Sequence, residues 1–243
     1  DWTTSGTCRW MIDAGGCLTI EPQFGAKSGE LSGFNWLSYK DDITSLVVKR
    51  NVRFGSTSAR QMFYQCSKLA TVDLTGLDTS QVTDMSQMFE GCKSLKSADL
   101  SGFDTSQVTN IAGLFDRCES LESVNLSGFD TSQVTDMSSM FSDCYVLASL
   151  DVSSFDTSQV TTMFRMFSWC ESLETLDLSG FDTSQVTTMN RMFEMCESLE
   201  TLDLSSFDTS QVTNMFCMFS ACPKLVSLDL SSFNTSKVEN MSG

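Results

Sequence analysis

Apolar residues return along most of this chain with a fixed spacing of 26 residues. In each unit a methionine or leucine followed by phenylalanine, such as Met62-Phe63, precedes a cysteine, and a leucine follows that cysteine by three positions. The seven cysteines that mark the period are Cys66, Cys92, Cys118, Cys144, Cys170, Cys196 and Cys222. Self-similarity at such a period is the signature of a tandem-repeat solenoid, in which each unit covers the apolar face of its neighbour.

Each unit predicts a short strand and a short helix. Apolar and polar side chains alternate over Leu176-Asp177-Leu178, which is typical of a strand with one buried face. The next apolar residues fall at i, i+3, i+4 and i+7, the spacing of one helix face: Met189, Met192, Phe193 and Cys196. The predicted fold is an α/β repeat solenoid, a leucine-rich-repeat-like right-handed coil with a short parallel strand and a short helix per repeat. A helix-free β-helix is the alternative, and the helical spacing argues against it.

The region where the period holds defines two predicted parts of the chain. Residues 46–243 contain about seven tandem repeats, whereas residues 1–45 lack the period and are predicted to form an N-terminal β-hairpin cap. The chain reaches Met241-Ser242-Gly243 where the next Met-Phe pair is due, so no C-terminal cap is expected.

The repeat Leu-Asp-Leu-Ser-x-Phe-Asp-Thr-Ser-x-Val-Thr-x-Met-x-x-Met-Phe-x-x-Cys resembles that of the BspA-like surface proteins, the DUF285 type, over roughly residues 46–243. The head, with Gly6-Thr7-Cys8 and Trp10-Met11-Ile12-Asp13, is similar to the hairpin that precedes such arrays. The resemblance implies extracellular or cell-surface exposure, a leucine-rich-repeat-like fold and a role in adhesion or partner binding. It implies no catalytic residues, and the chain departs from the usual pattern in showing no anchor segment.

Charge and composition narrow the classes of partner. The chain carries 31 acidic and 15 basic residues, a net charge of −16, and no histidine. A nucleic-acid partner is excluded because its phosphates require a basic footprint, and membrane insertion is not expected because no long apolar run exists. Without histidine there is no Ser-His or Cys-His dyad, and a regular column offers no pocket that singles out two carboxylates. We therefore expect no enzyme.

The polar position inside the predicted strand forms a column of carboxylates: Asp73, Asp99, Asp151, Asp177, Asp203 and Asp229, with Asn125 between them. Hydroxyls, including those of Thr175 and Thr201, lie on the same predicted face. Together they predict a concave acidic strip that binds a partner. Stacked carboxylates repel, and solvent relieves that repulsion unless calcium bridges the Asp177 column. Calcium is the one cofactor considered, and no other metal is expected. A second column, Asp78, Asp104, Asp130, Asp156, Asp182 and Asp208, is assigned to turn capping.

Outward positions near the Met-Phe pairs vary between repeats and become apolar late in the array. The large apolar side chains there are Phe164, Trp169, Met195 and Phe216. They predict either a partner or self-association patch or packing against the next repeat, and both alternatives stay open.

The repeat cysteines are predicted to be buried thiols, because they share the apolar face. A disulfide between Cys8 and Cys17 is left open, since simple hairpin register places Ile12 near residues 17–18 instead. Cys217 falls on a variable outward position and is predicted to be an exposed thiol.

The leading hypothesis is a non-catalytic, secreted or surface-displayed adhesion module that binds a protein or glycan ligand on a host, a matrix or a neighbouring cell. The alternative is a structural subunit that self-assembles into a filament or surface layer through its uncapped C-terminal end.

Overall fold

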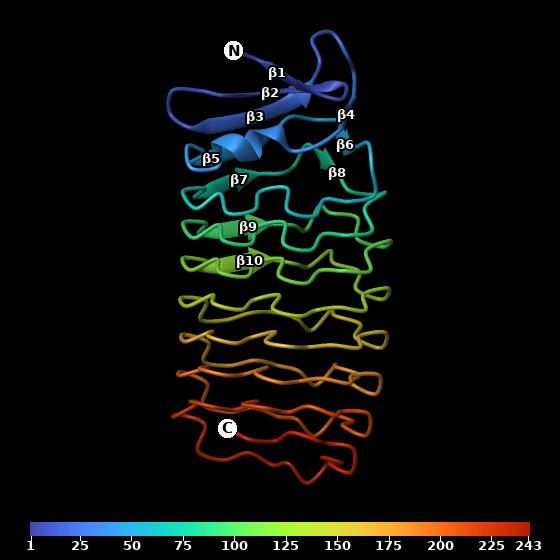
Figure 1. Ribbon diagram of the computed structural model, residues 1–243, viewed down its shortest axis with the longest axis vertical. Coiled ribbons are helices and arrows are strands. Elements are labelled where there is room, and N and C mark those ends of the chain that lie inside the picture. The colour runs from blue at the N-terminus through green and yellow to red at the C-terminus, as the bar shows by residue number, and fades with distance from the viewer.

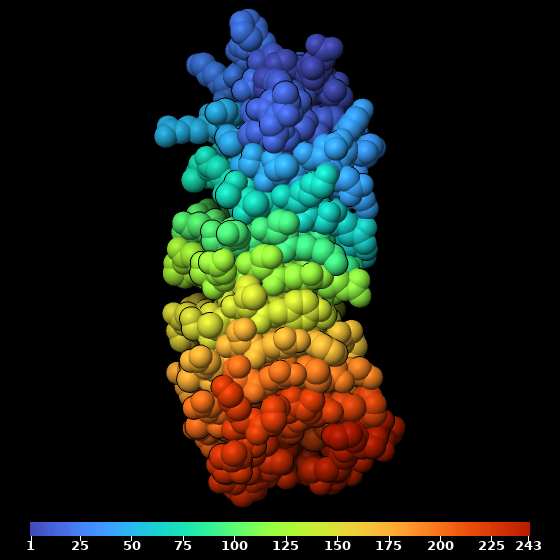
Figure 2. Space-filling model, turned by 90° about the vertical axis from the view of Figure 1, so that its left-hand side faces the viewer, coloured from blue at the N-terminus to red at the C-terminus, as the bar shows by residue number.

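A computed structural model of the protein, which describes all residues 1–243, is a β-solenoid of flat coils stacked along one axis (Figure 1). The N-terminus lies at one end of the stack and the C-terminus near the other. Figure 2 shows the same coils as successive layers in space-filling form. The stack runs nearly straight in both views, so the concave bend expected from the leucine-rich-repeat analogy is not seen.

One side of the stack is a ladder of short strands that begins in a hairpin. Strands β1 (Thr3–Ser5), β2 (Cys8–Ile12) and β3 (Cys17–Pro22) pair antiparallel. Strands β5 (Ser45–Val48) and β7 (Thr71–Asp73) then add in parallel, giving the order β1-β2-β3-β5-β7. Because β3 belongs both to the hairpin and to the parallel ladder, the predicted cap joins the array without a break. The boundary between residues 45 and 46 stays a prediction.

The remaining elements complete each turn of the coil. Strands β4 (Gly29–Leu31), β6 (Val52–Phe54) and β8 (Leu77–Asp78) form a second parallel sheet. Strands β9 (Ser97–Asp99) and β10 (Ser123–Asn125) pair in parallel further along the stack. Later coils are joined by single parallel bridges such as Ser149 to Thr175. The one helix is a 3-10 turn, η1 (Asn35–Tyr39), whose Trp36 ring is fully buried.

The predicted helix in each repeat is wrong, because the Met-Phe segment bonds to the next coil instead of to itself. The backbone N–H groups of Gln61, Phe63 and Gln65 donate to carbonyls 25 residues on, at 3.1, 2.9 and 2.7 Å. The intervening N–H groups of Met62 and Tyr64 donate three residues back, at 3.1 Å each. Since the backbone donors are satisfied in this way, no i to i−4 bonds remain for an α-helix.

Two left-handed residues in each repeat make that path possible. Gln61 and Gln65 have φ angles of 60° and 57°, and the two equivalent positions remain left-handed in every following repeat as far as Cys217 and Ala221. The resulting series of tight turns still brings side chains inward every three or four residues. The apolar spacing therefore imitated a helix, and the helix-free alternative describes the architecture.

The core is a set of columns that run the length of the stack. The phenylalanines of the Met-Phe pairs stack with ring centroids 5.4–6.1 Å apart, and Trp36 covers the first ring at 6.3 Å. The column contains Phe63, Phe89, Phe115, Phe141, Phe167, Phe193 and Phe219. Methionine, cysteine, leucine and valine columns are buried beside it. This continuous core explains why each unit needs its neighbours.

Candidate functional site

The predicted acidic strip lies on the strand side of the stack. Its members, which we call the acidic strip, are all exposed: Asp73, Asp99, Asp151, Asp177, Asp203, Asp229, Thr175 and Thr201. Because the stack is nearly straight, this face is flat and not the concave surface that was expected.

The strip carboxylates are held by their own turns. One oxygen of Asp177 accepts the Ser179 N–H at 2.9 Å, and each other strip carboxylate accepts in the same way. These hydrogen bonds lower the pKa of Asp177, outweighing the smaller repulsion from Asp151. The carboxylates are therefore ionised at neutral pH, and turn hydrogen bonds relieve their mutual repulsion. No three histidine, cysteine or carboxylate side chains converge with metal-ligand geometry, and calcium at the Asp177 column stays a prediction.

The second acidic column caps turns, as predicted. Asp130 accepts the Ser132 N–H at 3.0 Å, and the other members do the same with the serine two residues on. The buried threonines that follow link adjacent coils. Thr105, for example, donates to the Asp130 carbonyl at 2.9 Å and accepts the Asp130 N–H at 2.8 Å. This column is therefore part of the scaffold.

The repeat cysteines are free and packed in the core, which confirms the prediction of buried thiols, although the last, Cys222, is only half-buried. The Cys92 thiol donates to the Phe63 carbonyl of the preceding coil at 3.2 Å, and the same contact recurs along the stack. Burial raises the pKa of Cys92 well above its ordinary value. Such thiols stay protonated and are poor nucleophiles.

The three cysteines outside the column lie in different surroundings. Cys8 and Cys17 are both free in the structure. Strand register places Cys8 opposite Pro22 and Cys17 opposite Ser45, and Ile12 is the residue that faces Leu18. Cys217 is half-buried, not fully exposed, and adopts a left-handed φ of 52°.

The other long face of the stack displays side chains that differ from repeat to repeat. We call it the variable face and define it by the two left-handed columns and the position that precedes the first of them. The first left-handed column is Gln61, Gln87, Gly113, Ser139, Arg165, Arg191 and Cys217, and the second is Gln65, Gly91, Arg117, Asp143, Trp169, Met195 and Ala221. The preceding position holds Ser86, Ala112, Ser138, Phe164, Asn190 and Phe216. Hydrogen bonds between coils fix this backbone, so side chains here can vary without changing the fold.

The late apolar side chains belong to this face. Phe164, Trp169, Met195 and Phe216 are all half-buried. Trp169 packs edge-on against Tyr145 at 6.4 Å, and the Arg191 guanidinium lies 5.1 Å from the Phe216 ring centre. These contacts hold part of each ring against the scaffold and leave part open, so the partner patch stays a prediction.

Two carboxylates on the variable side were missed from sequence. Glu90 and Asp116 occupy the position directly after the Met-Phe or Leu-Phe pair in consecutive repeats, and both line a cavity of about 330 Å³. Other repeats have tyrosine, serine or glutamate there: Tyr64, Ser142, Ser168, Glu194 and Ser220. Reading this position as a column would have shown two adjacent acids beside the core.

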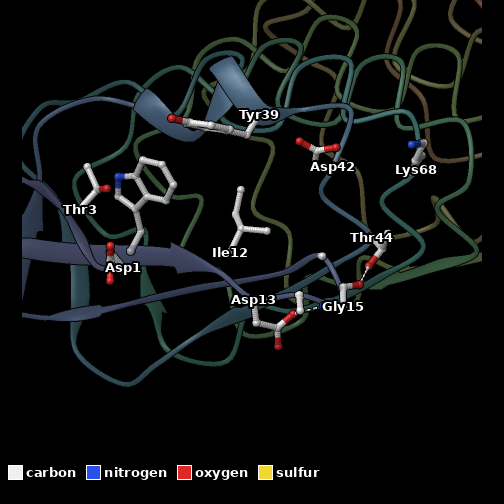
Figure 3. Close-up of a pocket in the computed structure, with 12 residues that line it drawn as sticks. Asp1, Thr3, Ile12, Asp13, Gly15, Tyr39, Asp42, Thr44 and Lys68 are labelled. Atoms are coloured by element: carbon white, nitrogen blue, oxygen red, sulfur yellow. Dashed lines mark hydrogen bonds between the residues drawn. The ribbon is translucent and has the colours of Figure 1, made fainter.

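A second missed feature is an open pocket of about 650 Å³ near the N-terminal end of the stack. In Figure 3, Tyr39 and Asp42 face Ile12 and Asp13 across it. The Asp13 carboxylate accepts the N–H groups of Gly15 and Cys17 at 2.8 and 3.0 Å, which shapes the hairpin turn at one edge. The pocket also reaches Asp1, the first residue of the sequence.

No helix in the structure is long and apolar enough to span a membrane.

Comparisons with known proteins place the repeats in one family. A family profile described as "Mycoplasma protein of unknown function, DUF285" matches residues 57–174 and 146–243. A leucine-rich cell surface protein from Faecalibacterium prausnitzii A2-165 is 17% identical, with 93% of this chain and 87% of that chain covered and a TM-score of 0.31. A leucine-rich repeat protein from Eubacterium ventriosum ATCC 27560 is 16% identical, with 98% and 91% covered and a TM-score of 0.27. No curated protein matches. Structural likenesses this distant do not assign a function.

Proposed function

Because the chain belongs to the DUF285 family, we propose that it is a non-catalytic binding module, displayed outside the cell, that contacts a protein partner through its variable face. The observation that carries this proposal is the division of labour between columns. The side chains of the constant columns form coil-to-coil hydrogen bonds, cap turns or pack in the core. In the two left-handed columns, by contrast, the backbone is the same in each repeat and the side chains differ. A rigid scaffold with variable display is the arrangement that repeat proteins use for recognition.

The composition of the variable face supports a protein partner. It combines aromatic, methionine and arginine side chains, among them Trp169, Met195 and Arg165, which are enriched in protein interfaces. Their half-buried placement means that each is already partly ordered, so less conformational entropy is lost on binding. Display outside the cell agrees with the excess of acidic residues, because a net charge of −16 favours solubility and attraction to basic partners.

The acidic strip is a second proposed contact surface. Its carboxylates are exposed, ionised and held by turns, so they offer a regular row of acceptors to a protein or glycan ligand. The row is nearly uniform along the stack, which fits multivalent attraction better than selective recognition.

The proposal is tested by measuring saturable binding of the full chain to host-cell surface proteins and to matrix proteins on a biosensor. The variable-face variant combines Phe164→Ser with Trp169→Ser, and the matched strip variant combines Asp151→Asn with Asp177→Asn. We expect the first to reduce binding at least tenfold and the second less than threefold. Absence of saturable protein binding, or an effect confined to the strip variant, would contradict the assignment to the variable face.

Self-assembly is the second candidate function, and one observation favours it. Apolar side chains line a cavity of about 370 Å³ on the last coil, and Met241 is 60% exposed there. Phe219 and Phe233 lie in the same cavity, and either a further repeat of the same chain or a second copy would cover this apolar surface. Light scattering coupled to size-exclusion chromatography distinguishes the two candidates, because a concentration-independent monomer excludes self-assembly by the isolated chain.

A further inference from the structure

The cavity of about 330 Å³ on the variable face has properties that the scaffold does not explain. It spans several coils, with Ser86 and Glu90 at one end and Phe164 at the other, and Asp116 between them. Four buried side-chain polar atoms in the whole structure have no hydrogen-bond partner, and two of them, Ser86 Oγ and Asp116 Oδ1, line this cavity. Buried polar groups are nearly always paired, so two unpaired acceptors in one cavity point to a ligand that donates hydrogen bonds.

The Ser86 hydroxyl is the clearest of these groups. The residue is only 3% exposed, and its oxygen neither donates to nor accepts from any other group of the protein. Its neighbours in the same column are Arg60 and Ala112, so the scaffold itself does not require a hydroxyl here. A buried hydroxyl without a partner destabilises the fold, which is a cost that binding can offset.

The carboxylates give the cavity its charge. Glu90 is 9% exposed, and one of its oxygens accepts from the Gln87 amide at 2.5 Å. Asp116 lies in the same position of the next coil, without a salt-bridge partner closer than 4.0 Å. Burial, and next the charge of Glu90, raise the pKa of Asp116 to about 7. A raised pKa means that too little positive charge lies near the carboxylate to stabilise its ionised form.

None of the basic residues nearby forms a salt bridge with Glu90 or Asp116. Arg60 lines the cavity, but its guanidinium donates to the Gln87 side chain at 3.0 Å. Arg165 donates to Asp143 at 3.4 Å, and Asp143 also accepts from Tyr145 at 3.1 Å. Arg117 and Arg165 lower the pKa of Asp116, but by less than burial and Glu90 raise it, so the protein's own cations neutralise this carboxylate only in part.

We infer that this cavity receives a lysine or arginine side chain of the protein partner, with its cationic head between Glu90 and Asp116 and its aliphatic stem against Phe164. The inference rests on the proposed function and specifies what the partner must present. A basic head supplies both the positive charge and the several N–H donors that Asp116 Oδ1 and Ser86 Oγ lack. The aromatic ring of Phe164 at the other end of the cavity suits the aliphatic stem. A divalent cation fits less well, because no three ligand side chains converge.

Binding of this kind is linked to pH. The charged groups that act on Asp116 are Glu90, Asp143, Arg117 and Arg165, while Arg60 and Asp136 complete the cavity wall. A bound cation favours the ionised form of Asp116, so affinity rises as pH increases through about 7. Asp116 is mostly protonated at pH 5.5 and mostly ionised at pH 8, so the apparent affinity should be weaker at pH 5.5 by about an order of magnitude.

The test uses the full chain and a dodecapeptide of six Arg-Gly pairs, titrated calorimetrically at pH 8 and near-physiological salt. A peptide with citrulline in place of arginine keeps the shape and removes the charge. The cavity variant combines Glu90→Gln with Asp116→Asn. The matched control combines Glu197→Gln with Glu200→Gln, which removes the same charge from two exposed residues away from the cavity.

We expect the affinities of the arginine peptide for the wild type and the control to agree within twofold. Its affinity for the cavity variant should be at least tenfold weaker. The citrulline peptide should not bind. Equal weakening in both variants would overturn the inference in favour of diffuse attraction to an acidic protein. Tight binding of CaCl2 alone that is lost in the cavity variant would overturn it in favour of a metal site. If the cavity variant does not fold, the wild-type titration between pH 5.5 and 8 decides: a flat profile overturns the inference. A further outcome is that the arginine peptide binds the cavity variant as well as the wild type while the natural partner still binds the variable face. That result would overturn this inference and leave the proposed function standing.

Discussion

The two long faces of this solenoid use the same amino acid in opposite ways. On the strand side, Asp177 is exposed and its pKa is lowered by the N–H and hydroxyl of Ser179. On the variable side, the pKa of Asp116 is raised to about 7 by burial and by Glu90. The first carboxylate stabilises a turn, and the second destabilises the fold at neutral pH. A column that repeats regularly is therefore not by that fact a binding surface, because the regular Asp177 column has a structural role in capping turns.

The backbone shows the same contrast. On the strand side, extended residues pair in register, and polar side chains cap the turns that follow. On the variable side, left-handed residues turn the chain repeatedly while every second N–H reaches the next coil. Three measurements can break or sharpen this comparison.

The largest effect is expected beneath the variable face. Phe141→Ala removes a fully buried ring that stacks on Phe115 and Phe167 at 5.9 and 6.1 Å. We expect a loss of ~3–5 kcal/mol in the free energy of unfolding, measured in urea. Val124→Ala, under the strand side in β10 and only partly buried, should cost ~1 kcal/mol. Similar losses at both positions would show that the stacked rings contribute no more to stability than the apolar residues under the strand side.

A smaller effect is expected for the threonine ladder. Thr105→Val keeps the shape of the side chain but leaves both the N–H and the carbonyl of Asp130 without the Thr105 hydroxyl. We expect a loss of ~2 kcal/mol in the free energy of unfolding in urea, because partly buried backbone groups would lose their partners. Ser106→Ala at the neighbouring half-buried position is the control and should cost less than ~1 kcal/mol. A neutral Thr105→Val would show that water replaces the hydroxyl and that the column is not structural.

The smallest effect is expected at the left-handed positions. Ser139 has a φ of 55°, and Ser139→Gly should stabilise the protein by ~0.5–1 kcal/mol because glycine adopts this conformation without strain. Gly113 has a φ of 63° in the preceding repeat, and Gly113→Ser should destabilise it by ~1 kcal/mol. Thermal unfolding followed by circular dichroism resolves both changes. Effects of the same sign in the two exchanges would contradict the claim that backbone, not side chain, defines these columns.

Much of the scaffold was predictable from sequence, because each core position recurs with the period. The column from Phe63 to Phe219, the buried cysteines and the turn-capping carboxylates were all inferred correctly. The helix was not, since tight turns through left-handed residues bring apolar side chains inward at helical spacing. Gly91 and Gly113 occupy these left-handed positions and were the available signal, but the six other residues at each position obscured it.

The candidate site was less predictable, because it depends on deviations from the repeat. Glu90 and Asp116 become notable only when the fold buries them in adjacent coils beside an unpaired Ser86 hydroxyl. Sequence spacing places residues in columns, but it does not tell which column faces solvent and which lines a cavity. The Asp177 column is regular along the stack because each of its carboxylates caps the turn that follows it.

The central claim is that one face carries structural carboxylates and the other carries carboxylates kept for a partner. The most direct test is the free energy of unfolding of wild type, Asp116→Asn and Asp177→Asn between pH 4.5 and 8. A raised folded-state pKa means that ionising Asp116 destabilises the fold increasingly as pH rises from about 4 to 7. The free energy of unfolding of Asp116→Asn should therefore rise by ~2 kcal/mol relative to that of the wild type over this pH range, after allowance for partial solvent screening. A lowered pKa means that Asp177 is already ionised throughout, so Asp177→Asn should be less stable than wild type by an amount that does not change with pH. An Asp116→Asn difference that is flat or falls with pH, or a rise of the same size in Asp177→Asn, would contradict the division between the two faces.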